Sequence, residues 1–104
     1  MNDERLNEKA RNARQAVWFI KTTDDWGGNY PGDTVRVIVH ELFGPPHREW
    51  VKYHCVRIAV WGNDDGAMHK DLPEHAWDEA LAEAKAFPEP ITKKWLAEHG
   101  YQVF

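Results

Sequence analysis

The chain has 104 residues, 42% of them hydrophobic and 29% charged, with a formal net charge of −4, which is typical of a single small globular domain over residues 1–104. The acidic balance disfavours a general nucleic-acid-binding protein, because phosphate contacts require clustered Lys and Arg. The one cysteine cannot form an intrachain disulfide, and the absence of a signal-peptide pattern and of a run of about 18 apolar residues predicts a cytoplasmic protein with no membrane attachment.

The first predicted element is a helix at the N-terminus. Its apolar positions recur at steps of four and three residues, which places them on one helical face: Leu6, Ala10, Ala13, Val17 and Ile20. We expect this helix over residues 3–15, with an extension over residues 16–21. A strand over residues 16–23 is the alternative, because the run Val-Trp-Phe-Ile-Lys-Thr-Thr has high β propensity.

A loop is predicted over residues 24–33, which combine acidic residues, glycines and a proline. It contains two aromatic residues, Trp26 and Tyr30. These either fold back onto the core or form an exposed recognition loop, since Tyr and Trp are favoured contact residues.

Three β-strands are expected in the middle of the chain. Residues 33–43 predict the first strand, because they place three valines on one face by alternation. Residues 49–61 and 67–70, joined by a polar turn at residues 62–66, predict a β-hairpin in the densest apolar stretch of the chain, Trp50–Leu72.

The strand over residues 49–61 has a second face that is too apolar to be simply solvated. This face carries Tyr53, Cys55, Arg57, Ala59 and Trp61, whereas a half-exposed antiparallel strand is polar on one side. We therefore expect either that both faces of the sheet are covered or that one contacts a partner. A homodimer through this second face is one form of the latter.

Two helices and a terminal strand are expected in the last third of the chain. Pro73 is a favoured first helical residue, and Pro88 ends that helix. Thr92 is the predicted N-cap of a short helix over residues 93–98, and residues 101–104 predict a strand. The predicted fold class is α+β: an antiparallel sheet of three to four strands with an N-terminal helix and two C-terminal helices packed on it, in the order α-β-β-β-α-α-β.

No catalytic, cofactor-binding or metal-binding motif stands above background. The six histidines form no H-x-H or H-E-x-x-H pattern. His54 and Cys55 are neighbours on a strand and point to opposite faces, which disfavours a catalytic thiol. The turn at residues 62–66 resembles part of a calcium loop, but apolar residues would occupy its first and last ligand positions. We expect no cofactor and no enzymatic activity; a small metal- or ligand-dependent enzyme that uses His54 and His69 is an alternative.

The preferred functional hypothesis is a non-enzymatic protein-binding module. Six tryptophans, an acidic body and a two-sided apolar strand favour it, since aromatic residues are common contact residues and complementary charge attracts a basic partner. The expected partner-binding residues are three aromatics with an acidic rim: Trp26, Tyr30, Trp61, Asp64, Asp65, Glu79 and Glu83. Size and charge are typical of phage or mobile-element inhibitors of host nucleic-acid machinery.

A nucleic-acid-binding accessory protein is the main alternative. The predicted N-terminal helix would present a stripe of basic residues: Arg5, Lys9, Arg11 and Arg14. Glutamates are interleaved with this stripe, so nucleic acid is the less favoured partner.

Overall fold

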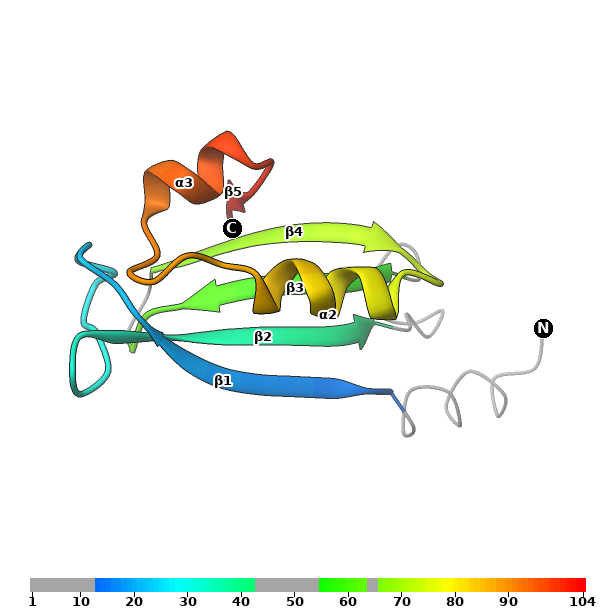
Figure 1. The fold of residues 1–104 in the computed structure, drawn as a ribbon, viewed down its shortest axis with the longest axis horizontal. Helices are drawn as coiled ribbons and strands as arrows, with labels where there is room; N and C mark the ends of the chain where they lie inside the picture. Colours follow the sequence, from blue (N-terminus) through cyan, green and yellow to red (C-terminus); the bar gives the residue numbers. More distant parts are fainter. Residues whose placement is uncertain (1–12, 43–54, 64–65) are drawn as a thin grey trace.

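The computed structural model describes residues 13–42, 55–63 and 66–104. These residues form a five-stranded antiparallel sheet with two short helices on one of its faces (Figure 1). The strands are β1 (Gln15–Lys21), β2 (Thr34–Leu42), β3 (Cys55–Trp61), β4 (Ala67–Pro73) and β5 (Gln102–Val103). The helices are α2 (Trp77–Lys85) and α3 (Lys93–Glu98). The strands lie side by side in chain order, and each pair of neighbours is antiparallel.

The predicted fold class is wrong at its N-terminal end. Strand β1 takes the place of the predicted helical extension, so the sheet has five strands and the order α-β-β-β-α-α-β is not observed. Trp18 and Ile20 pack on the core while Val17 and Phe19 are exposed, which is the two-residue period of a strand. β-branched and aromatic residues fit a pleated surface well, and this preference outweighs the helical spacing of the apolar positions. Residues 1–12, which carry most of the predicted helix, lie outside the described residues.

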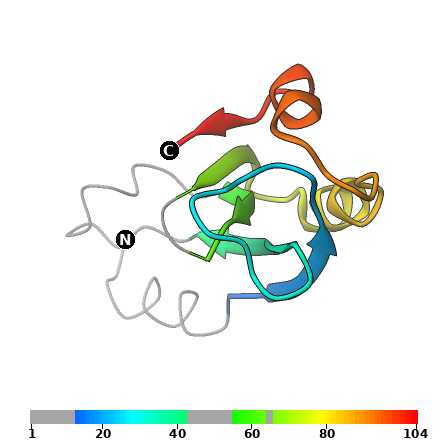
Figure 2. The same ribbon diagram turned by 90° about the vertical axis from the view of Figure 1, so that its left-hand side faces the viewer.

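The core lies between the sheet and the two helices. On the covered face, six β-branched side chains of β2 and β3 are fully buried: Val35, Val37, Val39, Val56, Ile58 and Val60. Helix α2 lies across β2 and β3 (Figures 1 and 2) and approaches them through the small buried side chains of Ala80 and Ala84. Leu96 of α3 and Tyr101 belong to the same cluster of buried residues. Both described helices therefore lie on one side of the sheet.

The loop between β1 and β2 folds back onto the turn between β3 and β4. Trp26 in this loop is fully buried, and its indole N–H donates to the hydroxyl of Thr22 at 3.0 Å. The Gly66 N–H donates to the carbonyl of Trp26 at 3.0 Å. The Asn63 N–H donates to the carbonyl of Gly28. Main-chain hydrogen bonds and one large buried ring thus close this end of the sheet.

Within the described residues, the hairpin and the C-terminal elements match the prediction; residues 49–54 of the predicted hairpin strand lie outside them. Strands β3 and β4 pair antiparallel over their full length. The next helix begins at Trp77 rather than at Pro73, because β4 continues to Pro73; proline is tolerated there since that end of β4 lies at the sheet edge. Helix α3 begins after its N-cap Thr92, whose hydroxyl accepts the N–H of Trp95 at 3.1 Å. Neither described helix is long and apolar enough to cross a membrane.

Candidate binding surface on the second face of the sheet

The candidate surface lies on the sheet face that points away from α2 and α3 (Figure 2), which we call the second face. The antiparallel register places its side chains in rows across the strands. The first row contains Phe19, Arg36, Trp61 and Ala67. The second row contains Val17, Ile38, Ala59 and His69. The third row contains Gln15, His40, Arg57 and Asp71.

Aromatic ring contacts connect the first row to its surroundings. The ring of Phe104 lies close to parallel with that of His69, with centroids 4.1 Å apart, and with that of Trp61, with centroids 4.9 Å apart. At the other end of the row, Phe19 contacts Tyr30 edge to face at 5.1 Å. Phe19 and Phe104 are 52% and 54% exposed. Phe19 at one end of the first row and Phe104, which stacks on Trp61 of that row, therefore present accessible aromatic rings.

An ion pair crosses the third row. Arg57 donates from Nε and Nη2 to the two carboxylate oxygens of Asp71 at 2.6 and 2.9 Å. The bidentate geometry and the partial burial of both side chains make this pair stronger than an exposed one. His40 lies beside Arg57 in the same row. Burial lowers the pKa of His40, and the Arg57 cation lowers it further.

The lowered pKa of His40 predicts a loss of stability at acidic pH. The folded state binds fewer protons at His40 than the unfolded state, whose histidine has a pKa of about 6.5, so the contribution of His40 is present above that pH and falls as the pH decreases. We expect the free energy of unfolding to decrease between about pH 7.5 and about pH 5, and His40→Gln to flatten this slope. Urea unfolding across this range measures it. His75→Gln, at an exposed position, should keep the wild-type slope; identical slopes in all three proteins would contradict the prediction.

The outer side of β1 is a strand edge. The Thr22 N–H donates to the carbonyl of Asp33 at 2.9 Å. The Glu41 N–H donates to the carbonyl of Arg14 at 3.1 Å. Even-numbered residues of this segment thus direct their main-chain groups toward β2. The odd-numbered residues direct theirs outward: Gln15, Val17, Phe19 and Lys21.

One end of this edge is already paired. The Lys21 N–H donates to the carboxylate of Glu89 at 3.0 Å, and the Lys21 carbonyl accepts the N–H of Ile91 at 2.8 Å. Over residues 15–19, no strand within the described ranges pairs with the outward groups. Val17 in this stretch is 45% exposed. A short strand edge with exposed apolar side chains therefore adjoins the second face.

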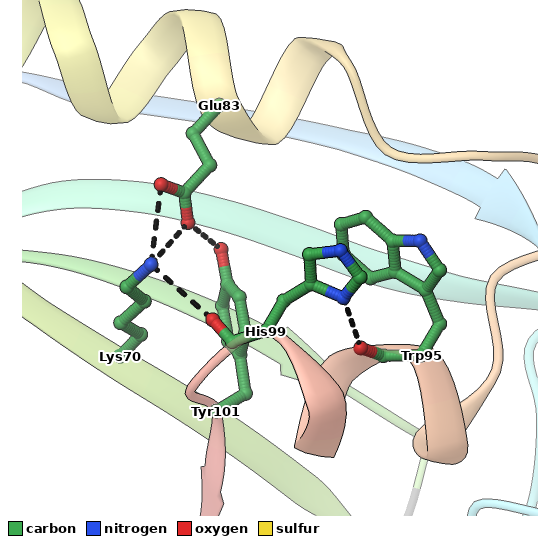
Figure 3. Close-up of polar contacts among 5 residues, drawn as sticks. All are labelled: Lys70, Glu83, Trp95, His99 and Tyr101. Atoms are coloured by element: carbon green, nitrogen blue, oxygen red, sulfur yellow. Dashed lines mark hydrogen bonds and ion pairs between the residues drawn. The ribbon is translucent and has the colours of Figure 1, made fainter.

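Glu83, a predicted rim residue, lies in a polar cluster on the other side of the sheet (Figure 3). Its Oε2 accepts from Lys70 Nζ at 3.1 Å and from the Tyr101 hydroxyl at 2.6 Å. Burial raises the pKa of Tyr101, and its hydrogen bond to Glu83 raises it further. Lys70 also donates to the carbonyl of His99 at 3.3 Å. These bonds join β4, α2 and the segment after α3, which is a structural role.

The other predicted contact residues differ in burial and do not form one surface. Trp26 is in the core, and Tyr30 is half-buried against Phe19. Trp61 is half-buried on the second face, and Glu79 is exposed on α2. The remaining two, Asp64 and Asp65, lie outside the described residues. Of the predicted contact residues that the structure describes, only Tyr30 and Trp61 lie at the surface that carries the first row.

Sequence reasoning missed Val17 and Phe19. The preferred helix contained both, whereas the alternative, a strand over residues 16–23, agrees with β1. Strand alternation in the run Val-Trp-Phe-Ile was the signal that could have identified them as exposed neighbours on one face. Arg14, predicted in a basic helical stripe, precedes β1 and donates from Nε to Glu41 at 3.0 Å. This bond lowers the pKa of Glu41.

The described histidines do not form a metal site. Within residues 13–42, 55–63 and 66–104, no group of three or more His, Cys, Asp or Glu side chains is placed to hold a metal ion. His69 stacks on Phe104, and its predicted partner His54 lies outside the described ranges. Cys55 is buried, and burial raises the pKa of its thiol to about 11. A thiol with such a pKa is a poor nucleophile at neutral pH.

Comparisons with protein-family models, with curated proteins and with solved structures gave no match. The chemistry and geometry of the chain's own residues therefore carry the functional inference.

Proposed function

We propose that this protein is a non-enzymatic protein-binding module that takes an extended segment of another protein onto the edge of β1. The observation that carries the proposal is the outward-facing main chain of residues 15–19, next to the exposed side chains of Val17 and Phe19. An extended segment that pairs with a strand edge gains main-chain hydrogen bonds, and pockets for alternate side chains supply specificity.

The ends of the edge define the length of the bound segment. At Lys21 the contacts with Glu89 and Ile91 occupy the outward groups, so an added strand has to end before that residue. Outward groups at Gln15, Val17 and Phe19 remain, which suits a segment of about five residues. On the second face this segment would meet Val17 and Phe19, so apolar side chains at alternate positions fit best.

On the face of the sheet that the helices cover, Trp18 is the β1 side chain beside the edge. Lys85 Nζ lies 3.9 Å from the centroid of its ring, and this cation–π contact fixes a positive charge beside the edge. An acidic or polar side chain of the added segment suits this position. The acidic body of the protein, at −4, favours a partner that is basic elsewhere. A cytoplasmic location and a role as an inhibitor of host nucleic-acid machinery are parts of the proposal that rest on size and charge.

Removal of one outward N–H tests this function. Val17→Pro eliminates that donor without touching the β1–β2 ladder, and we expect it to weaken capture of the partner from an extract of the source cells by about tenfold. Val17→Ile keeps both the donor and the apolar side chain and should bind as the wild type does. Circular dichroism checks that both variants are folded.

Amide hydrogen exchange of the complex supplies the second readout. The amides of Val17 and Phe19 should become protected on binding, while that of Trp18, which already pairs with β2, should not change. Undiminished capture by Val17→Pro, or a complex without new protection at these two amides, would refute the proposal. If the same amides become protected in the purified protein as its concentration rises, the partner at the β1 edge is a second copy of the chain and not another protein.

A further inference from the structure

We propose that the second face binds a small aromatic anion, a nucleotide by chemical class, with Arg36, Trp61 and Phe104 as its contact residues. This site extends from β2 to the residue that follows β5. It does not use the β1 edge, so it is independent of the function proposed above. A nucleotide fits because it carries a flat ring and a charged phosphate on one small molecule.

The ring component of the site is already assembled. Phe104 lies nearly parallel to Trp61, at an interplanar angle of 27°, and nearly parallel to His69, at 20°. Phe104 is 54% exposed, so part of this array is open to an incoming ring. Stacking of a nucleobase on aromatic side chains is favourable and tolerates any base, because every base has a π-face.

The charge component is Arg36, which lies directly beside Trp61 in the first row. Three arginines occur in the described ranges. Arg14 donates to Glu41 and Arg57 donates to Asp71. In contrast, Arg36 Nε is buried and has no hydrogen-bond acceptor among the described residues. A buried donor without an acceptor is unusual in a native structure, and an unpaired one calls for an explanation. The phosphate of a ligand would supply the acceptor in a strong charge-assisted bond.

His69 has a second buried polar atom that needs a hydrogen-bond partner from a ligand. Its Nδ1 is also buried without a described partner, and its ring contacts Phe104. The edge of a nucleobase carries both hydrogen-bond donors and acceptors, so a base that stacks beside the His69 ring could pair with its Nδ1. One unsatisfied polar atom therefore belongs to the neighbour of Trp61 in the first row, and the other belongs to a ring of the stack itself. A ligand with both polar and aromatic parts would complete this arrangement.

The charge of the chain limits the size of the ligand. A net charge of −4 repels a long polyanion, whereas a mononucleotide brings few charges to Arg36 and to Arg57, whose guanidinium lies 5.3 Å from the centroid of the Phe104 ring. The same chemistry could come from a free nucleotide or from one nucleotide of a single strand. The choice between these sources is made by experiment.

Nuclear magnetic resonance titration of the full chain tests the site. Adenosine monophosphate is expected to shift the indole N–H signal of Trp61, which Trp61→Phe identifies, and neutral adenosine should bind about tenfold more weakly. Arg36→Gln should weaken binding of the monophosphate by about tenfold, and Phe104→Ala by about fivefold or more. A six-residue oligoadenylate that binds much more tightly than the monophosphate would identify a single strand as the source, and equal affinities would identify the free nucleotide.

Matched controls separate the site from general charge effects. Lys94→Gln removes one exposed positive charge from α3, and Val103→Ala trims the exposed neighbour of Phe104. Both should leave the affinity unchanged. The inference is overturned if neither the monophosphate nor the oligonucleotide shifts the Trp61 signal, or if folded Arg36→Gln binds as tightly as Lys94→Gln. Because these variants leave the β1 edge intact, failure here leaves the test of partner capture unaffected.

Discussion

Replacement of Trp26 with alanine is expected to lower the free energy of unfolding by about 3–5 kcal/mol. The Trp26 side chain is fully buried in the main core cluster, so the variant leaves a large cavity. It also leaves the Thr22 hydroxyl without the indole N–H donor. Because a domain of this size has a stability of about 5–15 kcal/mol, this loss is a large fraction of the total. Urea unfolding followed by far-ultraviolet circular dichroism measures the change.

A phenylalanine at the same position separates the two contributions. Trp26→Phe keeps most of the apolar volume and loses the N–H, so we expect a smaller cost of about 1–2 kcal/mol. The pair also distinguishes a core residue from a contact residue. If Trp26 acted in partner binding, Trp26→Ala would reduce capture of the partner at unchanged stability. A loss of stability below about 1 kcal/mol for the alanine variant would contradict the core assignment.

Local patterns predicted the elements whose neighbours are close in sequence. The β3–β4 hairpin follows from two apolar runs around a polar turn, and the Thr92 cap identifies α3. In contrast, β1 lies next to β2 only after the chain has passed through the loop at residues 22–33. Before that pairing is known, the positions of Val17 and Ile20 fit a helix as well as a strand. Pairing with β2, together with the β propensity of this run, decided the secondary structure.

The same reason limited the prediction of the candidate surface. Trp26 and Phe19 are both aromatic residues near turns or strand ends, yet one is fully buried and the other is 52% exposed. Their burial depends on what each segment packs against. The β3–β4 turn covers Trp26, whereas Phe19 faces away from the helices. Composition identified a surplus of aromatic residues, and the register of the sheet determined which of them form a surface.

The turn at residues 62–66 shows how a correct local prediction still omits the main constraint. Its polar and glycine residues predict a turn by composition. The structure adds that Gly62 and Gly66 lie directly against the main chain of Trp26. These glycines are required by close approach of another segment rather than by the turn itself, since neither has a positive φ angle. Their substitution therefore tests a long-range contact.

Gly66→Ala is expected to destabilise the protein by about 2–4 kcal/mol. The added methyl group would overlap the main-chain carbonyl of Trp26, and backbone cannot move aside as the end of a flexible side chain can. Relief of the overlap separates the loop from the turn, which breaks the bond from the Gly66 N–H to that carbonyl. Thermal unfolding and the exchange rate of the Gly66 amide report the two effects, and the amide should exchange faster in the variant.

Gly32→Ala is the matched control for this prediction. A methyl group there would meet only the Thr34 side chain, at 4.0 Å, but Gly32 has a φ angle of +78°. Its cost is therefore conformational and should be about 1 kcal/mol. A greater loss from Gly66→Ala than from Gly32→Ala means that contact between the loop and the hairpin, and not backbone strain, dominates at this end of the sheet. Equal losses would show that Trp26 is held by its side chain and that its carbonyl contributes little.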